Sequence, residues 1–412
     1  MNRALIPIFL IVLVDVFGLT LVLPLQAIYA EHLGATPLQA TLLVSVFAIC
    51  QLVASPLLGS WSDRIGRKSV LLFSQIGALF GYLAMASATS LWMIYLARVI
   101  QGTTAGNLSI AQAYIADHSE AKDRAKSFAV IGVAFGLGFF IGPGVTGVLV
   151  KHGLAAPIFL AAGMSLVSIV CTLLLLPGGV AIRAQQPDAA LPGGKRLSIL
   201  EWRSYRAYFD RPVLAAMLFQ FLFYSMCFSV FTSGFSLYAE RRYVWHGHPF
   251  GPREIGYLFA YSGFLGLLLQ GGLIGRLVKR FGERSLVNAG YLSLVMGFGI
   301  IAASNSLQWL GVAATVTAFG NAVLRPTLSS LISQSADRSE QGTVIGLTQS
   351  LQSVAQIVAP FLAGLLLERN LLWQWGAMAS VAALGGLLIA PIGSQRAHSA
   401  AQELASDNKP AG

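Results

Sequence analysis

Charged residues are scarce in this chain of 412 residues: they make up 11% of it, whereas hydrophobic residues make up 55%. Soluble domains are typically about a quarter charged, so this composition excludes an ordinary water-soluble protein. Cysteine is also rare. Cys50, Cys171 and Cys227 all lie in apolar stretches, which argues against a disulfide framework or a cysteine metal site. HExxH and GxSxG motifs and His/Cys clusters are missing. A membrane-embedded enzyme is therefore the weakest functional class, and we expect no metal and no cofactor.

Long apolar runs, in contrast, fill most of the sequence. A membrane-spanning helix needs about 20 predominantly apolar residues. The hydropathy pattern predicts twelve of them, at 5–29, 38–58, 69–89, 91–116, 126–150, 155–177, 212–238, 253–274, 285–304, 308–332, 343–367 and 371–393. The first run is too long for a cleaved leader and contains Asp15, so it is expected to be a retained span.

The net charge of +10 is distributed unevenly. With a cytoplasmic N-terminus, the outer loops hold five of the 27 basic residues, namely Lys151, Arg241, Arg242, Arg253 and Arg369. Arg98 and Arg325 fall inside spans, and the remaining basic residues are cytoplasmic. This bias follows the positive-inside rule and predicts two cytoplasmic termini in a multi-pass protein of the inner (plasma) membrane. The basicity is thus a topology signal, and nucleic acid is not an expected partner.

A long polar stretch divides the chain into two similar parts. Six spans precede it in residues 1–177 and six follow it in residues 212–393, with a cytoplasmic tail at 394–412. The linker itself, 178–211, is rich in Pro, Gly and Ala at its start. Around 197–209 it mixes Arg with aromatic residues, as an amphipathic segment at a membrane surface does.

Two landmarks occur in both halves at nearly the same spacing. GSWSDRIGRK, which begins at Gly59, matches GRLVKRFGER, which begins 216 residues later at Gly275. Pro143 and Gly147 in the fifth span match Pro360 and Gly364 in the eleventh. Repeated halves are a feature of secondary transporters. We therefore predict an all-α membrane protein of twelve transmembrane helices in two pseudo-symmetric six-helix halves.

These motifs give the chain a family resemblance. GSWSDRIGRK resembles the signature loop of the major facilitator superfamily, LARVIQGTTAG its fourth-span motif, and GLGFFIGPGVTG the fifth-span motif of its antiporters. In the last motif, Thr146 stands where those antiporters usually have glycine. The first span, LVDVFGLTLVLPLQ, is similar to the twelve-span drug:proton antiporters, above all the tetracycline-efflux type. At three further polar positions of that type this chain has Gly81, Gly266 and Leu294, so another substrate is expected.

Asp15 and Arg98 are the predicted proton-coupling residues. Asp15 lies about ten residues into the first span, ~15 Å deep at the rise of an α-helix. An ionised carboxylate at that depth is costly, so it is expected to bind a proton or to pair with a cation. Arg98 is at a similar depth in the fourth span and is the expected partner, and the resemblance also implies a coupling role for it. A purely structural pair between helices is the alternative.

Arg325 and a set of polar residues are expected to line the substrate cavity. Arg325 precedes Pro326 in the tenth span; it either binds an anionic or zwitterionic group of the substrate or extends to the cytoplasmic surface. Pro326 is expected to free a backbone carbonyl as its polar neighbour. The other cavity candidates are Asn107, Gln112, Gln220, Tyr224, Asn321, Gln349 and Gln352.

The first decamer is predicted to form a cytoplasmic latch between the halves. Gly59 and Gly66 allow a tight backbone there, and Asp63 is placed to accept from the amides that begin the eleventh helix, around 342–345. Arg67 is placed to bridge Asp63 and Asp117, an arrangement that the family resemblance supports. The alternative is that these charges only fix the topology. In the second decamer Lys279 replaces the acid, so only the first is expected to act in this way.

Glycines of the fifth span form the last predicted site. The antiporter-type motif comprises Gly138, Gly142, Pro143 and Gly147, with Gly136 nearby. Glycine faces allow close helix packing and proline kinks a helix. The motif is thus expected to pack at the moving seam between the halves and not to bind substrate.

The sequence analysis therefore predicts a proton-coupled secondary transporter that exports a small amphipathic compound by alternating access, and that functions as a monomer in the lipid bilayer. Two rival functions remain. One is uptake of a nutrient or siderophore-like solute with protons, and the other is a membrane sensor that does not transport. The outer HGH sequence at 246–248 is expected to be solvated and not to bind metal.

Overall fold

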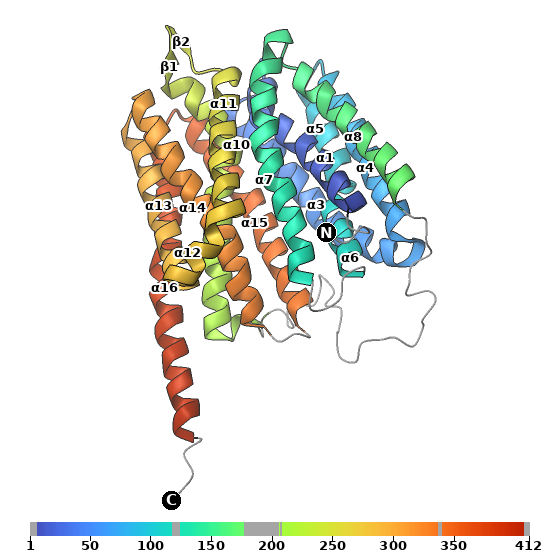
Figure 1. Cartoon of the computed structure of the whole chain (residues 1–412). Helices are drawn as coiled ribbons and strands as arrows, with labels where there is room; N and C mark the ends of the chain where they lie inside the picture. The colour runs from blue at the N-terminus through green and yellow to red at the C-terminus, as the bar shows by residue number, and fades with distance from the viewer. Residues whose placement is uncertain (1–5, 118–123, 177–205, 207, 337–339, 408–412) are drawn as a thin grey trace, which may run out of the picture.

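The structure is a computed structural model that describes residues 6–117, 124–176, 206, 208–336 and 340–407. It is a bundle of long helices with one short hairpin (Figure 1). Apolar runs form helices here because lipid offers no partners for backbone N–H and C=O groups, and a helix pairs them internally. The predicted linker 178–211 and its amphipathic segment lie almost entirely outside the described residues.

Helices of the first half occupy one side of the bundle, coloured blue to green in Figure 1. Its elements are α1 (Ile6–Val22), α2 (Gln26–His32), α3 (Pro37–Ile65), α4 (Arg67–Ala86), α5 (Leu91–Thr103), α6 (Asn107–Asp117), α7 (Arg124–Leu149), the 3₁₀ turn η2 (Val150–His152) and α8 (Ala156–Leu175).

Helices of the second half occupy the other side, coloured yellow-green to red. Its elements are α10 (Pro212–Arg242), β1 (Val244–Trp245), β2 (His248–Pro249), α11 (Pro252–Leu268), the π-helix η4 (Leu269–Leu273), α12 (Ile274–Phe281), α13 (Glu283–Ala303), α14 (Leu307–Gln334), α15 (Gln341–Glu368) and α16 (Leu372–Asp407). The antiparallel β1–β2 hairpin defines what we call the hairpin end of the bundle, and the opposite end is the linker end.

Within the described residues, ten helices are long and apolar enough to cross a membrane, or eleven if the bent pair α1 and α2 is one span. The prediction of twelve continuous spans is thus not fully confirmed. The fourth predicted span, 91–116, consists of two shorter helices, α5 and α6, because the chain leaves helical geometry between Thr103 and Asn107. At the other end of the chain, α16 continues to Asp407, well past the predicted end of the twelfth span at 393.

Two further spans are also irregular. α1 and α2 meet at 43°, and the carbonyl of Pro24 at this break accepts a hydrogen bond of 2.7 Å from Ser236 in the other half. The eighth span contains the π-helix η4. π-Helical turns inside α-helices occur frequently at functional sites. At such breaks, backbone groups become accessible to side chains. The hydropathy of the sequence does not predict this.

The repeated decamers have the same local structure. Gly66 separates α3 from α4 with φ of 99°, and Gly282 separates α12 from α13 with φ of 78°. Both are in the region that favours glycine. Gly59, in contrast, is inside helix α3 and has open space where a side chain would go. The prediction that Gly59 serves a tight loop is therefore wrong, whereas Gly66 does so.

Candidate transport site

Asp15 lies in the middle of α1, on the side that faces its own half. It is half-buried, and its hydrogen-bonding side-chain neighbours are Ser168 on α8 and Asn107 at the start of α6. One carboxyl oxygen, Oδ2, is buried and has no hydrogen-bond partner among the described residues. A buried carboxyl oxygen without a donor is costly when ionised. Protonation of this carboxyl group would remove that cost.

Arg98 is not the partner of Asp15 in this structure. Its guanidinium donates to Oε1 of Gln26 on α2 and, at 2.8 Å, to Oε1 of Gln101 on the next turn of α5. All three side chains are buried. Where the chain is described, no ion pair joins Asp15 to Arg98, and Tyr82 is close enough to interact electrostatically with both. The expected ion pair is thus absent, because the break at Pro24 brings the amide of Gln26 to the guanidinium.

A second polar group joins α4 to α8 near Asp15. The amide of Gln75 donates to Ser168 and Thr172, each at 2.8 Å. Ser168 therefore belongs to the surroundings of both Asp15 and Gln75. Sequence reasoning missed Gln75, Ser168 and Gln26. The signal was present, since each is a polar residue inside an apolar run, but nothing in the sequence selects them from the other such residues.

Arg325 lies beside a small pocket of the second half and does not extend to the surface. The pocket has a volume of about 10 Å³ and is lined by Arg325, Gln352, Gln356 and three residues of α10, Tyr224, Ser225 and Phe228. The guanidinium lies 5.3 Å from the ring centre of Phe135 on α7. In the part of the chain that the structure describes, Arg325 has no ion-pair partner. It is a cation whose neighbours are aromatic and amide groups.

The carbonyl freed by Pro326 has a different partner from the one expected. Proline lacks the N–H that would bind the carbonyl four residues earlier, which is Ala322 O. Gln270, in the π-helix η4, donates to that oxygen at 3.4 Å. The π-helix of the eighth span thus compensates for the proline of the tenth, and Arg325 remains available for another ligand.

The other predicted cavity residues are dispersed. Gln220 is buried inside the second half, where its amide donates to Gly386 O at 3.3 Å. Gln349 is exposed and Gln112 is half-buried. Asn107 and Asn321 each have a buried Oδ1 with no hydrogen-bond partner among the described residues. The structure therefore brings only Tyr224 and Gln352 of this set together with Arg325, and Gln220 has a packing contact instead.

The fifth-span glycine motif uses two faces of α7. A side chain at Gly138 would meet Val16 at 2.6 Å, and one at Gly142 would meet Thr20 at 2.1 Å, both on α1. Gly147 faces the other half, where a side chain would lie 2.8 Å from Arg253 O on α11. Thr146, the departure from the antiporter motif, donates to Leu21 O at 2.7 Å.

The matching residue of the eleventh span is at the matching seam. A side chain at Gly364 on α15 would lie 2.1 Å from Thr41 Oγ1 and 2.8 Å from Leu38 Cα on α3. Gly147 and Gly364 thus lie at the α7–α11 and α3–α15 contacts, both between the halves. Backbones approach this closely only where Cβ is missing.

The cytoplasmic latch is described in part. Arg67 forms an ion pair of 2.6 Å with Asp63 and donates to Ser62 at 2.6 Å, at the linker end. Both charged residues have further interactions. The side chains of Asp117, Gln341 and Gly342 lie outside what the structure describes, so the rest of the latch stays a prediction.

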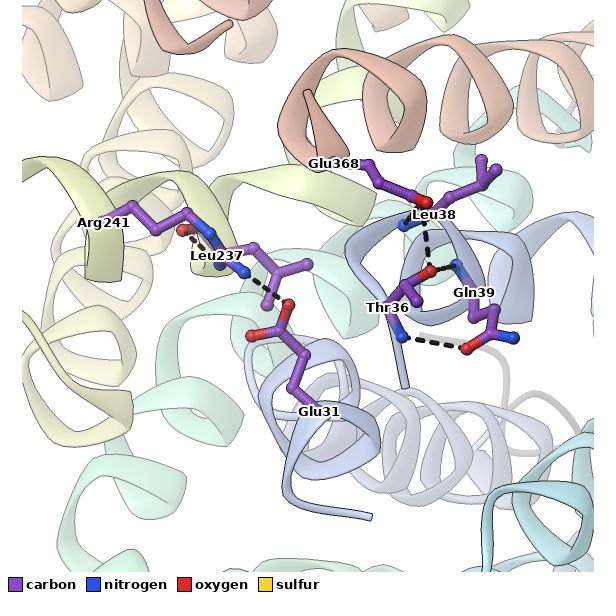
Figure 2. A network of polar contacts seen from close by, with 7 residues as sticks. All are labelled: Glu31, Thr36, Leu38, Gln39, Leu237, Arg241 and Glu368. Carbon is purple, nitrogen blue, oxygen red and sulfur yellow. Dashed lines mark hydrogen bonds and ion pairs between the residues drawn. The ribbon is translucent and has the colours of Figure 1, made fainter. Parts of the chain in front are cut away.

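A polar network joins the halves at the hairpin end (Figure 2). Arg241 on α10 forms an ion pair of 2.6 Å with Glu31 on α2. The carboxylate of Glu368, at the end of α15, accepts from Thr36 Oγ1 at 3.1 Å and from the backbone N–H of Leu38 at 3.2 Å. Glu368 therefore binds the N-terminus of α3 from the other half, where the helix dipole favours an anion. We call these four side chains the hairpin-end network.

No sequence motif marked the hairpin-end network. It uses the same device that the sequence predicted for Asp63, an acid at a helix N-terminus across the seam. The device is observed with Glu368, at the other end of the bundle. Together with the contacts of Gly147 and Gly364, it joins the two halves.

Comparisons with known proteins agree with this architecture. The profile of the Major Facilitator Superfamily matches residues 8–297 and 243–409. A tetracycline resistance protein, class D, of Salmonella ordonez is 27% identical over 95% of this chain and 96% of its own length. Multidrug resistance protein 2 of Bacillus subtilis (strain 168) is 26% identical over 88% of this chain and 90% of its own. A crystal structure of the human organic anion transporter MFSD10 (TETRAN) is 25% identical, with a TM-score of 0.66 over 94% of this chain and 99% of its own.

Fold and site define a multi-pass membrane transporter. The chain belongs to the Major Facilitator Superfamily, and its relatives include tetracycline and multidrug resistance proteins.

Proposed function

We propose that this transporter exports a small amphipathic compound in exchange for protons across the inner (plasma) membrane, with both termini in the cytoplasm. The hairpin end is then the outer side, as the scarcity of basic residues in the outer loops requires. The observation that carries the proposal is the buried Oδ2 of Asp15, which no described group binds. Names of relatives support the substrate class and the direction: two of them are resistance proteins for tetracycline and for multiple drugs.

Asp15 holds the exchanged proton in this mechanism. From the outer side a proton binds the carboxylate, which removes the charge from the middle of α1. The neutral group is compatible with an apolar surrounding, so the protonated carrier turns inwards. Loss of the proton to the cytoplasm restores the anion beside Asn107 and Ser168. Substrate and proton thus alternate, because each favours a different state of the same helix.

Arg325 gives the cavity its polarity in this proposal. A guanidinium without a carboxylate partner binds a carboxylate, phosphate or similar oxyanion well. Tyr224 and Phe135 beside it provide aromatic surface, and Gln352 provides an amide. An amphipathic compound with an anionic or zwitterionic group suits this combination.

The hairpin-end network and the seam glycines hold the state in which the outer side is closed. The contact of the Asp63 loop with the start of α15 is assigned to the opposite state, whereas the Asp63–Arg67 ion pair lies within the loop and is formed here. Alternating access then consists of exchanging one set of contacts for the other while the halves rock around the central site.

Proteoliposomes with an enclosed pH dye test the function. A compound gradient imposed across the vesicle is expected to move protons in the opposite direction, and Asp15→Asn is expected to abolish that movement. Asp210→Asn is the matched control, because Asp210 is exposed and lies before the start of α10. Proton movement in the same direction as the compound would establish uptake instead. Equal proton movement by wild type and Asp15→Asn would show that Asp15 is not the coupling group.

A further inference from the structure

A second cavity lies away from the seam, on the outer surface of the second half. It is a groove of about 480 Å³ between α13 and α16, at the hairpin end. Its size is in the range of pockets that hold small ligands, roughly 300–1,000 Å³. The floor is made of small residues, Gly299, Ala302 and Ala377. Because the two helices have no bulky side chains there, they leave a channel between their flanks.

The groove opens outwards from the bundle. Trp373 and Val381 on its rim are 59% and 66% exposed, so in a membrane they face lipid. It extends from Trp373 to Val381 on α16, eight residues or ~12 Å along the helix axis. All its walls belong to the second half. It shares no lining residue with the Arg325 pocket and does not depend on which compound is transported.

Arg242 closes the groove at the hairpin end. Its Nη2 donates to Ala302 O at 3.1 Å, and its Nε is buried and finds no acceptor among the described residues. The neighbouring Arg241 is paired with Glu31, whereas no carboxylate in the described part of the chain pairs with Arg242. A half-buried cation thus lies at the mouth of an apolar groove at the level where the spans end.

We propose that this groove is a binding site for a membrane phospholipid. The phosphate binds the guanidinium of Arg242, and one acyl chain lies along Gly299, Ala302 and Ala377 towards Val381. Trp373 lies at the interface, the depth at which tryptophan is enriched in membrane proteins. Charge and shape both contribute to binding. The guanidinium of Arg242 binds the phosphate, and the small residues of the groove leave space for the acyl chain. The proposal requires only that the protein spans a membrane. It does not depend on the direction of transport.

Native mass spectrometry of the delipidated full-length protein tests the site, with phosphatidylglycerol as the probe. Arg242→Gln is expected to weaken the tightest lipid-binding event about fivefold, the effect of one basic residue at a membrane surface. Arg369→Gln is the matched control, since Arg369 is another basic residue of the hairpin end and is outside the groove. Equal affinities for wild type and Arg242→Gln would overturn the proposal.

A second variant separates the lipid from a simple anion. Gly299→Leu keeps Arg242 and fills the groove, because the nearest atom to a side chain there, Ser380 Oγ, is 3.8 Å from Cβ. It is expected to lose the tight event while its thermal midpoint stays near that of wild type. Glycerol 3-phosphate, the headgroup without chains, is expected not to compete. Competition by glycerol 3-phosphate together with normal binding to Gly299→Leu would reduce the site to an anion site and refute the lipid.

Discussion

Glu31 and Arg241 form an ion pair of 2.6 Å that joins the first half to the second at the hairpin end. Beside it, Glu368 of the second half binds the N-terminus of α3 in the first half. Both contacts must break if the halves are to separate at that end. They therefore favour the conformation seen here over the opposite one.

Glu31→Gln combined with Glu368→Gln is expected to shift the protein towards the state that is open at the hairpin end. Each exposed pair contributes up to about 1 kcal/mol, so each loss changes the populations by up to about fivefold. Spin labels at the exposed Ser87 and Ser306, with the three cysteines replaced, report the distance between the halves. Arg369→Gln is the control, and high salt is expected to mimic the double variant partly by screening. An unchanged distance distribution in the double variant would assign the network no role in the equilibrium.

Gly364→Ala tests the seam itself. Its new Cβ would lie 2.1 Å from Thr41 Oγ1 and 2.8 Å from the backbone of Leu38. Overpacking of this kind costs about 1–3 kcal/mol, and the cost applies only to the state in which the seam is closed. The same spin labels are expected to show a larger open population. Gly346→Ala on the same helix has open space around it and is expected to behave like wild type; identical behaviour of both variants would contradict the close contact.

Gln26→Leu is expected to destabilise the first half. Arg98 is buried and uses Gln26 as one of its two acceptors, and loss of a hydrogen bond to a charged group costs about 1.5–3 kcal/mol. Adding Arg98→Met is expected to recover much of that loss, because the double variant no longer buries an unsatisfied cation. Unfolding by SDS titration measures the three free energies. Gln112→Leu, which removes a half-buried amide of the same half, is the control. If the effects of Gln26→Leu and Arg98→Met on the free energy of unfolding were purely additive, the two residues would not be coupled.

Arg325→Gln is expected to weaken transport of anionic or zwitterionic amphipathic compounds about tenfold at low concentration, as expected for the loss of a charge-assisted hydrogen bond. Neutral analogues are expected to be transported as before, and Arg325→Lys is expected to retain part of the activity. Arg280→Gln removes an exposed cation elsewhere on the second half and is the control. Equal losses for neutral and anionic compounds would show that Arg325 supports the structure and does not recognise the substrate.

Arg211 and Glu340 provide a pH-dependent contact at the linker end. Arg211 donates to both carboxylate oxygens of Glu340, at 2.7 and 3.0 Å, and this lowers the pKa of Glu340 below its usual value of 4.5. A lowered folded-state pKa means that the stabilisation is complete above the unfolded-state pKa and is lost as the pH falls through the folded-state value. The pair is partly exposed, so the effect is at most about 1 kcal/mol.

Thermal midpoints measured from pH 7 down to below 4 check this. The difference between wild type and Glu340→Gln is expected to be constant above pH 5 and to shrink below 4.5, since protonated Glu340 resembles glutamine. A difference that stays constant across the whole range would exclude the ion pair as its cause.

Several elements could be predicted because their causes are local. Apolar runs of sufficient length predicted most spans, and the positive φ of Gly66 recurs at Gly282, as the matched decamers indicated. The paired glycine–proline motifs indicated repeated halves; Gly147 and Gly364 lie at seams, whereas Gly138 and Gly142 pack on α1 within the first half. The break in the fourth span and the π-helix of the eighth were missed. They depend on contacts such as Gln270 with Ala322 O, whose partners are 52 residues apart.

The candidate site was only partly predictable, for the same reason. Depth along two helices predicted an Asp15–Arg98 pair, but depth says nothing about which face each helix turns to its neighbour. Gln26 comes within reach of Arg98 only because the chain bends between α1 and α2. Gln220, chosen for its polarity, faces α16 and not the cavity.

The sequence by itself determined that this chain is a membrane protein, which end of each helix is basic, and which family it resembles. These follow from composition and short motifs, where each residue acts through its own chemistry. Tertiary structure alone decided the partners: Glu31 with Arg241, Glu368 with α3, Arg98 with Gln26, and the groove beside Arg242. Each joins groups on different helices, and the packing of whole helices, not any local sequence, sets their distance.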